Sequence, residues 1–180
     1  MTQIKFPQFP QFINIHRFTN VLNSSEIKEN LIKGNKDYDF AFINTKLIFS
    51  QSQLYSAIYR SLLELNNNNL RTKNIHSEIL FCLSPINNIM EALKNFGIQN
   101  STFDFIVIKI SDNLEIDYNL NIINGEEIKF EQINNELIKF VDLKKLYKIY
   151  KLGTFKEVLN NEDILLINQK IINSIQLRGQ

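Results

Sequence analysis

The sequence predicts a single compact α+β domain in which a small mixed or antiparallel sheet packs with several helices. Short unbroken apolar runs, such as residues 105–108, are typical of strands covered on both faces. Apolar stripes at helical spacing lie between these runs, without the strict alternation of a parallel sheet. A length of 180 residues suits one domain with one sizeable core. We therefore expect one domain over residues 1–180, with residues 1–11 as an extended N-terminal arm.

The chain begins with the pattern of a surface arm followed by a half-buried strand. Pro7 and Pro10 fix backbone angles and remove two ladder donors, which favours an extended arm anchored by phenylalanines. Apolar and polar side chains alternate within residues 12–21, so this segment is expected to form a strand with His16 on its polar face.

A short helix and a covered strand are expected next. Asn23 or Ser24 can cap the helix, and the pair Gly34-Asn35 is expected to stop it. The apolar residues 40–43 then predict a short strand.

The central stretch from Ser50 to Pro85 predicts a long buried helix, a basic loop and a strand. Ser50 and Gln53 have the spacing of a capping box, so the helix is expected to begin here. The asparagines at 66–69 are expected to end it in an exposed turn. The apolar run at 79–83 predicts a strand covered on both faces.

The second half of the chain predicts further helices and strands. Ser84-Pro85 is typical of a helix start, and Gly97 is expected to end that helix in the left-handed conformation. Residues 111–124 are weakly patterned and fit either a loop or a short helix. The remaining patterns predict strands at 103–110 and 127–130, a charged helix at about 132–150 and a last helix capped by Asn160 or Asn161.

The last predicted helix carries two apolar stripes. One consists of Ile164, Ile167, Ile171 and Ile175, and the other of Leu165, Leu166, Ile172 and Leu177. Two stripes indicate one face against the core and one against something else, while a simply buried helix is the alternative.

Composition and residue types narrow the chemistry. A formal net charge of +1 excludes binding of nucleic acid by bulk charge alone, although a local basic patch is allowed. One such patch, at residues 144–151, fits either phosphate contact or a solvated helix face. The isolated glycines form no phosphate-binding loop, and two histidines with one cysteine form no usual zinc site. We therefore expect no catalytic residue, no metal, no cofactor and no enzymatic activity.

The single cysteine and the hydropathy pattern bear on the cellular compartment. Cys82 lies in an apolar run, so a structural role in the core is expected, and no internal disulfide can form. This indicates a reducing compartment. No apolar stretch approaches the roughly 20 residues that span a bilayer.

Several blocks of residues carry a resemblance to a known family. They are Tyr55-Ser56-Ala57-Ile58-Tyr59, Arg71-Thr72-Lys73-Asn74 with Ser77-Glu78, Cys82-Leu83-Ser84-Pro85 with Asn88-Ile89, Phe96-Gly97-Ile98, Lys148-Ile149-Tyr150-Lys151-Leu152 and Ile175-Gln176-Leu177-Arg178-Gly179. In this order they resemble the small subunit of the KEOPS (EKC) complex, the family called TPRKB or PRPK-binding protein in animals, in its fungal branch. Residues 66–69 and 111–124 show no family pattern.

The resemblance implies a non-catalytic subunit, present in nucleus and cytoplasm, that binds the small atypical kinase/ATPase of KEOPS. Through the kinase it implies an indirect link to the threonylcarbamoyl-transferase subunit, and hence to t6A modification of tRNA and, in fungi, to telomere maintenance. It also implies binding of tRNA, including the single-stranded 3′ end, and no membrane partner.

Candidate residues follow from the resemblance and the patterns together. The tRNA candidates are Arg71, Lys73 and Asn74, whose alternative is a solvated turn. The candidates for kinase binding are Leu166, Ile171, Ile172, Leu177 and Arg178. A generic homodimerising interaction module without an RNA role is the alternative for the whole protein.

Overall fold

The computed structural model describes residues 1–114, 118–129 and 137–178, and it has the predicted α+β architecture. Its antiparallel sheet has the strand order β1-β2-β4-β3, and β5 also pairs with β2. The two short strands share one edge of β2, since β1 pairs with residues 13–15 and β5 with residues 17–19. The strands are β1 (Thr2–Ile4), β2 (Phe12–Thr19), β3 (Ala41–Asn44), β4 (Phe105–Ser111) and β5 (Glu126–Ile128).

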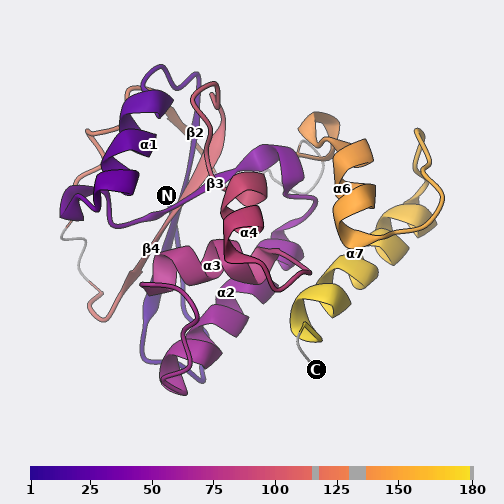
Figure 1. Ribbon diagram of the computed structural model, residues 1–180, viewed down its shortest axis with the longest axis horizontal. Coiled ribbons are helices and arrows are strands. Elements are labelled where there is room, and N and C mark those ends of the chain that lie inside the picture. Colours follow the sequence, from indigo (N-terminus) through magenta and orange to yellow (C-terminus); the bar gives the residue numbers. More distant parts are fainter. Residues whose placement is uncertain (115–117, 130–136, 179–180) are drawn as a thin grey trace.

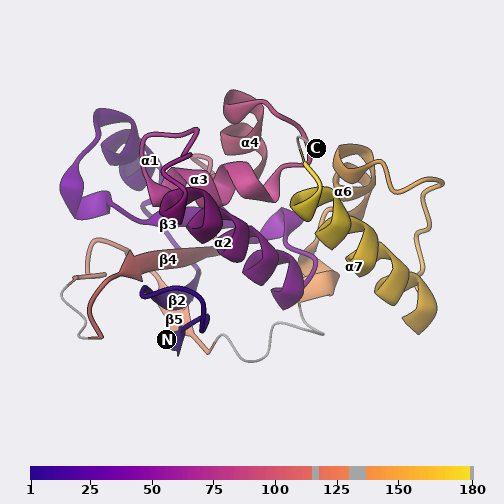
Figure 2. The ribbon, with the colours of Figure 1, turned by 90° about the horizontal axis from the view of Figure 1, so that it is seen from below.

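The helices cover the sheet unequally. Figure 1 shows α1 on one side of the sheet and α2, α3 and α4 on the other, with α6 and α7 beyond them. The turned view in Figure 2 shows α7 lying along α2 at the end of the molecule farthest from α1. The bounds are α1 (Ser24–Lys33), α2 (Gln51–Asn66), α3 (Ile75–Leu83), α4 (Ile89–Phe96), α6 (Leu143–Tyr150) and α7 (Asn161–Gln176), with 3₁₀ turns η1 (Lys36–Tyr38), η2 (Thr45–Leu47) and η4 (Leu137–Phe140).

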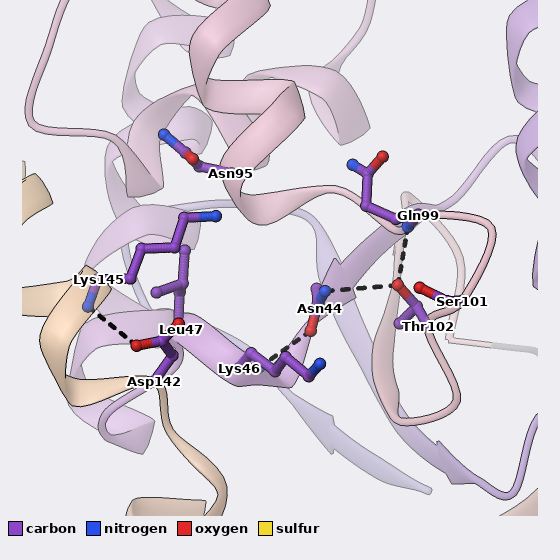
Figure 3. Close-up of a pocket in the computed structure, with 9 residues that line it drawn as sticks. All are labelled: Asn44, Lys46, Leu47, Asn95, Gln99, Ser101, Thr102, Asp142 and Lys145. Carbon is purple, nitrogen blue, oxygen red and sulfur yellow. Dashed lines mark hydrogen bonds between the residues drawn. The ribbon is translucent and has the colours of Figure 1, made fainter.

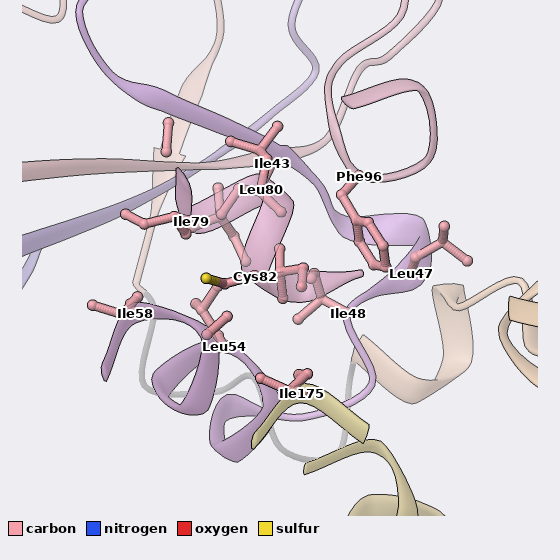
Figure 4. Packing of buried hydrophobic residues seen from close by; sticks show 14 of the residues in the cluster. Ile43, Leu47, Ile48, Leu54, Ile58, Ile79, Leu80, Cys82, Phe96 and Ile175 are labelled. Carbon is pink, nitrogen blue, oxygen red and sulfur yellow. The ribbon is translucent and has the colours of Figure 1, made fainter. Parts of the chain in front are cut away.

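Each face of the sheet has its own apolar core. On one face Ile15 and Ile108 pack with the buried sides of α2 and α3, and this core continues to α7. Figure 4 shows part of it, where Ile58, Cys82 and Ile175 converge from three helices. On the other face phenylalanines of β2, β3 and β4 pack with α1. Since both faces are covered, β3 and β4 carry continuous apolar runs, as predicted, whereas β2 also buries Asn14, His16 and Arg17.

The strand predicted at 79–83 is wrong, because Ile75–Leu83 forms helix α3. The Asn74 side chain caps this helix by accepting a hydrogen bond from the Ser77 amide at 2.8 Å. Residues 79–83 are all buried, so no polar face marks the helical period. A short buried helix and a buried strand cannot be distinguished by periodicity alone.

The helix start at Ser84-Pro85 and the left-handed Gly97 are also wrong. α4 begins at Ile89, where Asn88 Oδ1 accepts from the Glu91 amide at 3.1 Å. Gly97 does follow the helix, but in an extended conformation with φ −76°. A Cβ at Gly97 would lie 2.4 Å from the Leu93 carbonyl oxygen, so glycine is needed here for space.

Other boundaries differ from the expectation. The single helix expected at 132–150 is instead η4 and α6, separated at Asp142, whose carboxylate caps α6 by accepting from the Lys145 amide. Its first residues, 132–136, and Phe130 of the strand expected at 127–130 lie outside the described residues. His16 is on the face opposite Ile15, as expected, but it is buried there and bonded to Glu127 and Tyr118.

The N-terminal segment forms part of the sheet instead of a simple surface arm. Residues 2–4 make β1, and Phe9 is buried with its ring edge-on to Tyr59 of α2. The phenylalanine anchor is therefore confirmed. Among the described residues, no helix is long and apolar enough to cross a membrane.

Candidate functional site

The basic loop, which we define as residues 70–74, is the part of the connection between α2 and α3 that leads into α3. α2 ends at Asn66, and Asn68 turns the chain with φ 52°. The Arg71 and Thr72 amides then both donate to Glu78 Oε2, at 3.0 and 2.9 Å. A buried carboxylate on α3 therefore holds the loop from inside.

The two cations of the basic loop are exposed on its outer side. Arg71 Nη1 donates to Asn87 Oδ1 at 2.9 Å, which leaves its other nitrogens available. Lys73 is exposed and has no bonded partner in the part of the chain that the structure describes. An exposed guanidinium two residues from an exposed ammonium can contact a phosphate or carboxylate ligand.

Asn74, the third predicted tRNA residue, forms hydrogen bonds within the protein through both ends of its side-chain amide. Its Oδ1 caps α3, and its Nδ2 donates to Asp39 Oδ1 at 3.2 Å. One bond at each end of the amide thus holds the loop, while a second N–H donor and a second acceptor position of this exposed side chain remain.

Asp39 forms a second support beneath the loop. It accepts from Asn74, from His76 Nδ1 at 2.9 Å and from Lys109 Nζ at 3.1 Å. His76 Nε2 in turn accepts from the Ile110 amide of β4 at 3.2 Å. The hydrogen bond from His76, aided by Lys109, holds the pKa of Asp39 well below its usual range. This network ties the start of α3 to the sheet.

The outer stripe of α7, which we define as Leu165, Leu166 and Leu177 with the partly buried Ile172, is an exposed apolar feature near the C-terminal end. The three leucines are 50–60% exposed. The inward residues Ile167, Ile171 and Ile175 are buried against the core. The two-stripe pattern predicted for this helix is confirmed.

Two of the residues predicted to bind the kinase face inward. Ile171 has no exposed surface and belongs to the core stripe, so it is not an outward anchor. The Arg178 guanidinium donates to the carbonyls of Phe81 and Ser84 and lies 3.9 Å from the Phe81 ring centroid. These contacts attach the segment that follows α7 to the end of α3, so the Arg178 side chain has an internal role.

Arg60 of α2 completes the attachment of α7. Its guanidinium donates to the backbone carbonyls of Ile175, Gln176 and Arg178, the last two at 2.7 and 2.6 Å. These are carbonyls at the end of the helix, where a cation is favoured. The sequence patterns identified neither Arg60 nor Glu78 as a site residue, since both lie within apolar helical segments.

Cys82 is buried in α3, as expected. Burial raises the pKa of Cys82 to about 12, although Arg178 Nη2 lies 3.7 Å from its sulfur. The thiol is therefore protonated and structural.

A polar cleft of about 250 Å³ lies between η2, α4 and the start of α6 (Figure 3). Lys46 and Lys145 line it, together with Asp142. The side chains of Asn44 and Thr102 are bonded to each other at 3.4 Å. No nucleophile paired with a base lines this cleft, and no cluster of three metal-ligating side chains occurs within residues 1–114, 118–129 and 137–178.

Comparison with known proteins decides the family. The sequence model of the kinase binding protein CGI-121 family matches residues 18–179. The chain belongs to the CGI-121 family. This agrees with the resemblance seen in the ordered blocks of the sequence.

Fungal members of the CGI-121 family match almost the whole chain. A protein of Candida albicans is 41% identical, with 98% of this chain and 97% of the relative covered. A protein of Yarrowia lipolytica is 37% identical, with 98% of this chain and 99% of the relative covered. A protein of Aspergillus fumigatus is 33% identical, with 98% of this chain and 95% of the relative covered. All three are named EKC/KEOPS complex subunit CGI121.

Proposed function

We propose that this CGI-121 protein is a non-catalytic subunit of a KEOPS (EKC) complex that binds the small atypical kinase of the complex through the outer stripe of α7. The names of the family and of the fungal relatives support this proposal. The observation that carries it is the exposed stripe itself: the side chains of Leu165, Leu166 and Leu177 are each at least half exposed. Helix faces of this kind dock through a few apolar anchors.

The basic loop is the proposed tRNA contact, including the single-stranded 3′ end. Arg71 and Lys73 are exposed on a backbone fixed by Glu78, which supports a preorganised site for a few phosphates. Through the kinase and the transferase subunit, the protein would support t6A modification of tRNA and telomere maintenance in nucleus and cytoplasm.

The kinase contact is tested by charged replacement of the exposed leucines. Leu166→Asp and Leu177→Asp are each expected to weaken kinase binding by about 2–4 kcal/mol, because they place a charge in a desolvated interface. Ile32→Asp on α1, which is 78% exposed and lies on the other side of the sheet, is the control. Binding is measured by co-purification and calorimetry, with unchanged circular dichroism of each variant. If both leucine variants bind like the control, the stripe is not the kinase interface.

The same exposed stripe would also suit a homodimerising module without an RNA role. Analytical ultracentrifugation separates the two functions: a dimer that forms with rising concentration and is lost in Leu166→Asp favours the module. A monomer that is inert alone but changes the ATPase activity of the kinase favours the KEOPS subunit.

The tRNA contact is tested by reversing the charge of the basic loop. Arg71→Glu with Lys73→Glu is expected to abolish tRNA binding and leave kinase binding intact, and trimming the 3′ end of the tRNA should weaken wild-type binding to a similar extent. The slope of the logarithm of the tRNA binding constant against the logarithm of the salt concentration should become shallower by about one unit for each cation removed. Lys144→Glu with Lys148→Glu makes the same charge change on α6. If tRNA binding is lost in the Lys144→Glu, Lys148→Glu double variant and not in the variant of the basic loop, the site lies on α6.

A further inference from the structure

Glu78 is a buried carboxylate whose side-chain hydrogen bonds, among the described residues, all go to the inner side of the basic loop. Its side chain has no exposed surface. Oε2 accepts from the amides of Arg71 and Thr72 and lies 2.8 Å from Thr72 Oγ1, a hydroxyl that is also 3.0 Å from the Asn74 carbonyl oxygen. One carboxylate oxygen therefore fixes two successive residues of the loop, one of which carries the exposed guanidinium.

The surroundings of Glu78 are strongly charged. A small cavity beside it, of about 20 Å³, is lined by Arg60, Arg71 and Arg178 together with Glu64 and Asn87. Glu78 Oε1 and Arg60 Nε both are buried, and neither has a hydrogen-bond partner within the described residues. Burying a carboxylate is costly, and a polar neutral side chain could cap a turn at lower cost. The charge here instead serves to hold backbone amides in one conformation.

We propose that Glu78 is the positioning residue of the basic loop, holding the Arg71–Thr72 backbone so that Arg71 and Lys73 face the RNA together. This inference rests on the proposed tRNA contact. Glu78 does not touch the RNA in this arrangement, because it is enclosed by the loop and α3. It acts on affinity by removing loop conformations before binding, which lowers the entropy cost of forming the complex.

The charge of Glu78 and its positioning role predict opposite changes in RNA affinity when the charge is removed. This difference makes the proposal testable. Glu78 carries a negative charge next to cations that meet phosphate. If it acted only as a charge, removing it would strengthen RNA binding. If it positions the loop, removing the charge weakens RNA binding, since an amide oxygen in the place of Oε2 accepts the two backbone hydrogen bonds less strongly than a carboxylate oxygen does.

The test compares Glu78→Gln with Glu64→Gln in binding to labelled tRNA by fluorescence anisotropy. Glu64 lines the same cavity, and its carboxylate bonds to Asn69 and not to Arg71 or Thr72. The two variants make the same charge change. Glu78→Gln is expected to bind about three- to ten-fold more weakly than wild type, the range of one or two lost hydrogen bonds. Glu64→Gln is expected to bind as tightly as wild type or more tightly. Equal or tighter binding by Glu78→Gln overturns the proposal.

Amide hydrogen exchange provides a readout that does not depend on RNA. The Arg71 and Thr72 amides are expected to exchange faster in Glu78→Gln than in wild type, by a larger factor than the amides of β4 in the same variant, and equal factors overturn the positioning role. If Glu78→Gln does not fold, Thr72→Val removes one partner of Oε2 from the exposed side and is expected to weaken tRNA binding about two-fold. Unchanged affinity then overturns the proposal. Failure of the tRNA contact itself is seen separately, as wild-type affinity of the Arg71→Glu, Lys73→Glu double variant.

Discussion

At the scale of single residues, the buried polar side chains of the described residues form hydrogen bonds with backbone groups more often than with other side chains. Glu78 binds two loop amides, Arg60 binds the end of α7, and Arg178 binds the end of α3. Each spans two elements that are far apart in the sequence or meet at a loop. Hydrogen bonds to charged groups are worth about 1.5–3 kcal/mol each, so these few residues fix the positions of the helix ends.

Asp39 is expected to make the stability of the folded protein fall as the pH falls. Its pKa is lower in the folded protein than in the unfolded chain, so its contribution to stability is present above the unfolded-state pKa of about 3.9 and is lost as pH falls below it. We expect the melting temperature of wild type to exceed that of Asp39→Asn at pH 7, and the difference to shrink between about pH 5 and pH 2. Thermal melts across this range measure it. A difference that stays constant with pH would contradict the network with His76 and Lys109.

At the scale of elements, α7 is stabilised at its start by a capping box. The Asn160 side chain accepts from the Asp163 amide at 2.8 Å, and the Asp163 carboxylate accepts from the Asn160 amide at 3.3 Å. The helix also begins with Glu162 and Asp163, which complement its dipole.

Asn160→Ala is expected to destabilise the protein by about 0.5–2 kcal/mol through loss of this cap. Asn161→Ala is the matched control: the same change one position later removes no cap and places a good helix former in the first turn. Urea denaturation of both variants measures the difference. Equal losses at the two positions would show that the cap contributes nothing.

The elements also show where sequence patterns succeed. The cap at Ser50, the stop at Gly34 and the two stripes of α7 each depend on neighbours in the chain, and each was predicted. α3 was not, because its burial is decided by α2, α4 and the sheet together. The sequence did contain a helix signal, since Asn74 stands three residues before Ser77 and Glu78 lies in the first turn.

In the candidate site, too, features that depend on neighbours in the chain could be predicted from the sequence. Exposure of Arg71, Lys73, Leu166 and Leu177 agrees with what local pattern and resemblance indicated. The inward positions of Ile171 and Arg178 and the bond from Asn74 to Asp39 depend on partners 35 or more residues away in the chain. Nothing in the neighbouring sequence encodes those partners.

At the scale of the whole molecule, α7 packs mainly on α2, at the opposite end from α1. β4, in contrast, is paired on both edges by β2 and β3 and is covered on both faces. The molecule therefore has a deeply enclosed centre and a peripheral helix that presents its outer stripe to solvent.

Hydrogen exchange should reveal this difference. We expect the amides of α7 to exchange at least about ten-fold faster than those of β4, because a peripheral helix opens without global unfolding. Binding of the kinase should slow exchange in α7 more than in β4. Exchange of α7 and β4 at one common rate would indicate a single cooperative unit and contradict this expectation.

The edges of the sheet bear on how the free protein avoids aggregation. Along its outer edge, β2 is shielded by β1 over residues 13–15 and by β5 over residues 17–19. The opposite edge is β3, only four residues long, and its Ile43 already bridges to Gly97. Long, flat, unpaired strands are the usual template for non-native pairing between chains. Short, divided edges deny that template, so within the described residues the exposed apolar face of α7 is not accompanied by a long open strand edge.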